Sequence, residues 1–157
     1  MLVIADTSPL VAIAACDGLS WLDTLFAEVR VPPAVFQEAT VQGKPQADRL
    51  RHYLQDKVLT IDLHDFVITT EGLGNGELQA MALYKKQHAN RLLIDDLRAR
   101  KAALRNDIHI IGSVGILLLA KENQLISTIK PYLQIIQQTD AHLSAKLIDK
   151  ALVIAGE

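Results

Sequence analysis

Short apolar runs alternate along the chain with longer segments of helical periodicity. The apolar runs predict strands at Leu2–Ala5, Glu28–Val31, Arg91–Ile94 and Ile108–Ile111, and the alternating Val58–Leu63 predicts a strand at a sheet edge. Helical patterns cover Pro9–Cys16, Trp21–Phe26, Pro33–Thr40, Gln46–Gln55, Glu77–Gln87, Leu97–Asn106, Val114–Asn123, Ile129–Thr139 and Ser144–Ala155. This order is typical of βαβ units built on a parallel sheet, so the predicted fold class is α/β.

Local signals around the first strand place a helix directly after an acid. Leu2–Ala5 is continuously apolar, as strands buried on both faces are. Ser8 is a favourable N-cap residue and Pro9 suits the first helical position, so the helix is expected to begin just after Asp6. Further along, the glycines in Glu71–Gly76 permit a positive φ or a close approach of the backbone.

Length and composition indicate one domain over residues 1–157. Half of the residues are hydrophobic but only 4% are aromatic, so the core is expected to be aliphatic, as in helices packed on a buried sheet. The single cysteine, Cys16, excludes an intrachain disulfide and a cysteine-rich zinc site.

Charge and hydropathy argue against several classes of protein. The net charge of −2 argues against a protein that coats nucleic acid through bulk positive charge, although a local basic rim would suffice for a nuclease. The N-terminus lacks the basic region of a signal peptide, and the longest apolar stretch, Val114–Ala120, is too short to span a membrane. A soluble, cytoplasmic protein is expected.

Acidic residues stand at several predicted junctions. Asp6 and the pair Asp95–Asp96 follow strands, Glu38 lies one turn into a helix, and Glu77 begins another. Ligands of open parallel sheets bind beyond the carboxyl ends of the strands, so these acids are expected to meet in one cleft. Two carboxylates about 4 Å apart repel by about 4 kcal/mol at an effective dielectric constant near 20, which a shared proton or a divalent cation can offset. Oxygen ligands without thiolates or a histidine cluster favour Mg²⁺ or Mn²⁺.

Each acid also has a purely structural interpretation. Asp6, Asp95 or Asp96 could cap the helix that follows it. Glu38 could be a solvated helical residue, and Glu77 could simply favour a helix N-terminus through the dipole.

Five segments together resemble the PIN-domain family. They are Ile4–Leu10 with Asp6-Thr7-Ser8, Val31–Glu38, the Gly-x-Gly-Glu segment Leu73–Glu77, Leu92–Arg100 with the acidic pair, and Ile111–Lys121. The resemblance covers nearly the whole chain in order. It implies a three-layer α/β/α fold with a central parallel sheet and a ribonuclease dependent on Mg²⁺ or Mn²⁺. Many relatives are VapC-like toxins of toxin–antitoxin pairs, and dimers are common among them.

The resemblance also implies roles for individual residues. The catalytic candidates are Asp6, Glu38, Glu77 and Asp96, and the metal candidates are Asp6, Asp95 and Asp96. The hydroxyl of Thr7 or Ser8 could bond a carboxylate, a metal-bound water or an RNA phosphate. Apart from the resemblance, the basic residues Arg98 and Lys101 are candidates for RNA binding. Arg98, Lys101 and Arg105 form one helical stripe, which would equally suit a solvated face. One departure from the family pattern is that Gly112 and Ser113 stand where many relatives carry a further acid.

Three functions are therefore compared. The first is a metal-dependent endoribonuclease, the toxin of a toxin–antitoxin pair, in which a metal-activated water attacks the phosphodiester. The second is a catalytically weak module that binds RNA or protein. The third, a phosphotransferase of the haloacid-dehalogenase type, is disfavoured because Ser8 stands where that class has a second Asp. The apolar helices Val114–Ala120 and Leu147–Ile154 suggest a homodimer or an antitoxin partner.

Overall fold

The central feature of the protein is a parallel sheet of four short strands. A computed structural model describes residues 1–62, 72–141 and 143–157. The strands are β1 (Leu2–Ala5), β2 (Glu28–Arg30), β3 (Arg91–Leu93) and β4 (Ile110–Ile111), in the spatial order β2-β1-β3-β4. All three pairings are parallel, which confirms the predicted α/β class.

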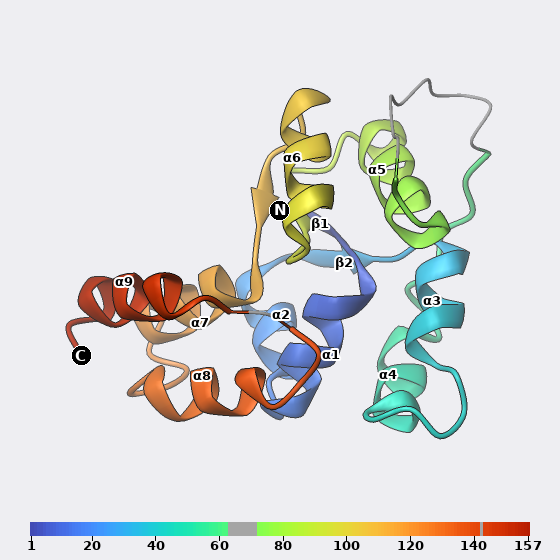
Figure 1. Cartoon of the computed structure of the whole chain (residues 1–157). Coiled ribbons are helices and arrows are strands. Elements are labelled where there is room, and N and C mark those ends of the chain that lie inside the picture. The colour runs from blue at the N-terminus through green and yellow to red at the C-terminus, as the bar shows by residue number, and fades with distance from the viewer. Residues whose placement is uncertain (63–71, 142) are drawn as a thin grey trace.

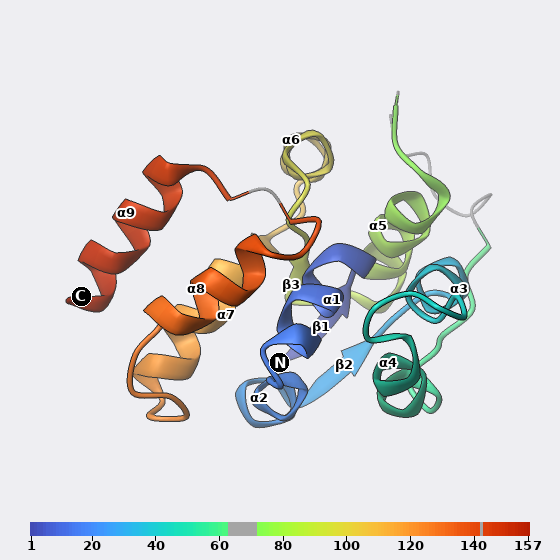
Figure 2. The same ribbon diagram turned by 60° about the horizontal axis from the view of Figure 1, so that its bottom comes forward.

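Helices cover both faces of the sheet. The helices are α1 (Thr7–Ala15), α2 (Leu19–Leu25), α3 (Pro33–Ala39), α4 (Ala47–Leu54), α5 (Asn75–Gln87), α6 (Leu97–Arg105), α7 (Ser113–Glu122), α8 (Lys130–Gln137) and α9 (Ala145–Ala155). In Figure 1, α5 and α6 lie on one side of the strands and α1, α2, α7 and α8 on the other. Figure 2 shows α9 at the outside of the molecule, where it packs on α7. The three-layer α/β/α arrangement is thus the one expected.

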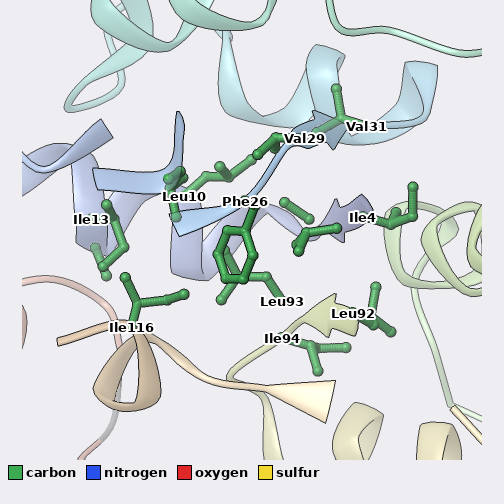
Figure 3. Packing of buried hydrophobic residues seen from close by; sticks show 14 of the residues in the cluster. Ile4, Leu10, Ile13, Phe26, Val29, Val31, Leu92, Leu93, Ile94 and Ile116 are labelled. Carbon is green, nitrogen blue, oxygen red and sulfur yellow. The ribbon is translucent and has the colours of Figure 1, made fainter. Parts of the chain in front are cut away.

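The core is aliphatic, as the composition predicts. The inner strands are continuously apolar, and Val3, Ile4, Leu92 and Leu93 have no exposed surface. Figure 3 shows Leu10 and Ile13 of α1, Ile116 of α7 and Phe26 on one side of the strands, and Ile4 of β1 with Leu92 of β3 on the other. Burial on both faces explains why these strands have no polar alternation.

The strand order defines where a ligand would bind. From β1 the chain moves outward to β2 and then returns to the other side of β1 to form β3, so connections leave in opposite directions on the two sides of the β1–β3 pair. Ala5 pairs with Leu93, and the Asp6 N–H donates to the Leu93 carbonyl at 2.9 Å. The carboxyl ends of β1 and β3 therefore lie side by side at the switch point of the sheet, where ligands of such folds bind.

Two local predictions are wrong. Val58–Leu63 is not a regular strand: its described part contributes only a parallel bridge between Val58 and Val31, and residues 63–71 lie outside the described residues. Ser8 is not the cap of α1, because the helix begins at Thr7 and Asp6 occupies the N-cap position. Proline has no amide N–H, and the N–H groups of the first helical turn have no partner within the helix, so proline is tolerated at any position of that turn. Pro9 therefore did not determine the residue at which the helix begins.

Within the ranges that the structure describes, we find no helix long and apolar enough to cross a membrane.

Candidate active site

Asp6 is the centre of the acidic site. It follows β1 directly and is 4% exposed, although its side chain makes no capping hydrogen bond to α1. Burial raises the pKa of Asp6 to about 7; the Thr7 backbone N–H acts in the opposite direction, and the charges of Glu77, Glu38 and Asp95 raise it further. Acids from three other parts of the chain therefore act on one buried carboxyl group.

Glu38 reaches the site from α3, and two neighbours fix its carboxylate. The Thr7 hydroxyl donates to Glu38 Oε2 at 2.9 Å. Gly76, in the first turn of α5, leaves the space that the carboxylate fills, because a Cβ there would lie 2.7 Å from Oε2 and 2.8 Å from Oε1. This is the close approach expected of the glycine-rich loop.

Glu77 lies in the first turn of α5, next to Gly76. Its Oε2 accepts a hydrogen bond from the Gly74 N–H at 2.9 Å, at the N-cap position of the helix. The structural role considered from sequence, support of a helix N-terminus, is therefore present. The same side chain is nevertheless the acid with the largest charge effect on the pKa of Asp6.

Asp95 extends from the end of β3 and is held by the start of α7. The Ser113 N–H donates to Asp95 Oδ1 at 2.8 Å, and a Cβ on Gly112 would lie 2.9 Å from that oxygen. Gly112 and the Ser113 N–H thus position the Asp95 carboxylate. Burial raises the pKa of Asp95, while the Ser113 N–H, the Ser113 side chain and the Arg100 charge lower it.

The second carboxylate oxygen of Asp95, Oδ2, differs from the first in its hydrogen bonding. Asp95 Oδ2 is buried and has no hydrogen-bond partner among the described residues. A buried carboxylate oxygen left in this way is costly unless a proton, a water or a cation reaches it.

Asp96 has a different environment from its neighbour. It is exposed, and its Oδ2 accepts from the Ala99 N–H at 2.9 Å, which caps α6. The acids whose charges chiefly raise the pKa of Asp6 are Glu77, Glu38 and Asp95. The structure therefore brings together Asp6, Glu38, Glu77 and Asp95, while Asp96 caps α6 and lines the same hollow as Asp95.

The residues predicted to contact RNA are divided between two places. Thr7 and the exposed Ser8 lie at the acidic site, at the start of α1. The Arg98 side chain lies against Gly72, and Lys101 is exposed on α6. Neither of these two basic residues lines either of the two hollows that the described residues form beside the site.

Two hollows flank the site and contain residues that the sequence did not single out for a role. One, of about 580 Å³, includes Glu38 and Lys44; the other, of about 600 Å³, includes Asp95 and Arg100. Ser8, Asp140 and Ala141 line both. Arg100 had a sequence signal, since it closes the motif that begins at Leu92, whereas nothing in the local sequence predicted the approach of Lys44 or Asp140.

The site suits a cation in its chemistry but is not a closed cage. Among the described residues, no group of three or more His, Cys, Asp or Glu side chains is arranged so that it could hold a metal ion. Magnesium in proteins is usually held by one or two carboxylates, with waters and substrate phosphates as the other ligands. The unpartnered Asp95 oxygen and the mutual repulsion around Asp6 fit such an open site.

Comparison with known proteins identifies a family. A family model described as a PIN domain matches residues 2–157. PIN domains are generally nucleases that use divalent metal ions, which supports a nuclease-type function here at a coarse level. Comparisons with curated proteins and with solved structures return no match.

Proposed function

Because the chain belongs to the PIN-domain family, we propose that it is a metal-dependent endoribonuclease. Its active site would lie at the carboxyl ends of β1 and β3. The observation that carries this proposal is the set of carboxylates around Asp6. A buried acid whose pKa is raised to about 7, with three further acids acting on it, is poorly stabilised by the protein alone. Such perturbed groups are typical of functional sites.

The side chains divide into roles according to their contacts. Asp6 and Asp95 would hold Mg²⁺ or Mn²⁺, since one is buried among like charges and the other has an unpartnered oxygen. When bound, such an ion supplies an activated water and offsets charge on the transferring phosphoryl group. Glu38, fixed by the Thr7 hydroxyl, would orient water at the site, and Glu77 would accept a proton.

Cleavage of a single-stranded RNA tests the proposal. We expect activity with Mn²⁺ or Mg²⁺, its loss in excess EDTA, and a decrease of about 100-fold or more in Asp6→Asn. Asp149→Asn, which changes an exposed acid of α9, is the matched control and should cleave normally. Undiminished cleavage in EDTA, or by Asp6→Asn, would contradict a metal-dependent mechanism at this site.

A second function, a catalytically weak module that binds RNA or protein, is favoured by two observations. The described acids do not form a ready-made cage, and no acid stands at Gly112 or Ser113. Calorimetric titration with Mn²⁺ distinguishes the two functions. Saturable binding that Asp6→Asn abolishes supports the nuclease, and the absence of binding supports the module.

We also propose that the protein is a cytoplasmic toxin that forms a homodimer or binds an antitoxin. Most of the apolar side chains of α7 pack inside the molecule, where Ile116, Leu117 and Ala120 are buried. They are therefore not available for a partner. On α9, however, Val153 is 80% exposed and Ile154 62% exposed, which supports a partner contact there. Light scattering of the purified chain tests the dimer, and a monomer at all concentrations would rule it out.

A further inference from the structure

The hollow beside Glu38 extends away from the acids along α1. Thr7, Val11 and Ala15 line it at intervals of four residues, so it follows one face of that helix. Its other walls come from residues 44–46, between α3 and α4, and from the end of α8 with the loop that follows. With about 580 Å³ it is within the size range of small-molecule sites.

The lining has an apolar floor and a polar rim whose only charges away from Glu38, among the described residues, are those of Asp140 and Lys44. Val11, Ala15 and Ile135 supply aliphatic surface. Gln46 and Gln138 supply amide groups that both donate and accept hydrogen bonds. A nucleobase has the matching chemistry, because its faces are apolar and its edges carry donors and acceptors.

The backbone of Gln46 is held in an unusual conformation at this rim. Its φ is +68°, in the left-handed region that non-glycine residues seldom adopt. Although Gln46 is the N-cap residue of α4, its side chain makes no capping hydrogen bond, and it lines the hollow. Such conformations cost free energy and cluster at ligand sites.

One cation completes the lining. Lys44 is exposed at the end of the hollow formed by residues 44–46, while Glu38 belongs to the end at the acidic site. A nucleotide lying along the hollow would thus have a basic group for a backbone phosphate on one side and the proposed cleavage site on the other.

We propose that this hollow binds an unpaired nucleobase of the RNA substrate, next to the bond that is cleaved. Gln46 and Gln138 contact the edge of the base, and Lys44 contacts a phosphate of the same strand. The inference rests on the proposed ribonuclease function and makes that site selective for single-stranded RNA with a particular base at one position.

An abasic scan tests the inference. A cleaved single-stranded RNA is resynthesised with one abasic nucleotide at each position on either side of the cut bond. Loss of the base that occupies the hollow should lower kcat/KM by about tenfold or more, whereas the other positions should change it much less.

Variants then connect that position with the hollow. Gln138→Ala should reduce the penalty of the abasic substitution at the same position, and Gln137→Ala, an exposed neighbour outside the lining, should not.

Val11→Phe, which fills the floor, should lower kcat/KM for the intact RNA and leave the abasic RNA less affected. Lys44→Gln should raise KM, with Lys130→Gln as its control. Thermal melting verifies that each variant is folded.

The outcomes separate the inference from the proposed function. A flat abasic scan, or a base preference that neither Gln138→Ala nor Val11→Phe alters, would overturn the nucleobase site while metal-dependent cleavage stands. A wild-type protein that cleaves no RNA with either metal would remove both.

Discussion

At the scale of single residues, the site depends on where a side chain is missing as much as on the acids themselves. Gly76 is buried at the start of α5, and the place of its absent Cβ is taken by the Glu38 carboxylate. The Thr7 hydroxyl holds the same carboxylate from the other helix. Two positions far from Glu38 in sequence therefore decide where that carboxylate lies.

We expect Gly76→Ala to impair cleavage without unfolding the protein. The added Cβ would displace both oxygens of Glu38, and disturbing a group that orients a metal site typically costs 10–100-fold. Alanine favours a helix more than glycine does, so the free energy of unfolding should change by less than about 1 kcal/mol. Single-turnover cleavage and thermal melting measure the two effects.

A double-mutant cycle gives the control. In a Glu38→Asp background the shorter side chain leaves room for the Cβ, so Gly76→Ala should there cost much less activity than in the wild type. Asn75→Ala, at the exposed preceding position, should have little effect in either background. Equal losses in both backgrounds would mean that Gly76 does not act through Glu38.

At the scale of elements, the sequence predicted the helices and the inner strands well because their apolar periodicity comes from the core. The sequence predicted the ends of the helices less well. Glu77 was expected to begin its helix, but α5 begins at Asn75. The Glu77 carboxylate instead accepts a hydrogen bond from the Gly74 N–H at the N-cap position. The alternation at Val58–Leu63 predicted a strand that its described part does not form, because Val58, Leu59 and Ile61 also suit an irregular segment packed on the core.

The pair Asp95–Asp96 shows what sequence order could not decide. Both residues follow β3, and only the packing of α7 against that strand end gives Asp95 the Ser113 N–H. Asp96 instead caps α6. The acids were found from the sequence, whereas their partners depend on contacts between distant elements.

We therefore expect the two aspartates to respond differently to substitution. Asp96→Ala should lower the free energy of unfolding by about 1 kcal/mol through loss of the α6 cap, and Asp96→Asn should not, because asparagine caps equally well. Asp95→Asn should abolish most cleavage, while Asp96→Asn retains it. Denaturant unfolding and cleavage rates measure these outcomes. Loss of activity in Asp96→Asn equal to that in Asp95→Asn would assign Asp96 to the catalytic site, as the family resemblance first suggested.

At the scale of the whole molecule, the acidic site acts against folding. The pKa of Asp6 is raised from 3.8 to about 7 in the folded protein, chiefly by burial, so the folded state holds this proton more tightly than the unfolded chain does. Below pH 3.8 Asp6 is protonated in both states and contributes no penalty. As pH rises from there to about 7, stability falls, and above pH 7 the full penalty of up to about 4 kcal/mol is present.

Comparison with Asp6→Asn isolates this contribution, because asparagine stays neutral at every pH. In metal-free buffer the variant should be more stable than the wild type at pH 8, and the difference should shrink towards pH 4. Chemical denaturation of both proteins across this range measures it. Parallel pH profiles would show that Asp6 ionises as freely in the folded protein as in the unfolded chain.

Metal binding should reverse the same penalty, which links the stability of the molecule to its proposed chemistry. Mn²⁺ at about 100 times its dissociation constant stabilises a folded protein by about 2.7 kcal/mol, or roughly 5–10 °C in Tm for a domain of this size. We expect that rise for the wild type at pH 8, a smaller one at pH 5 where a proton competes for Asp6, and almost none for Asp6→Asn. Because this readout requires no RNA, an equal rise in the variant would place the ion elsewhere even if the protein proves to be a nuclease.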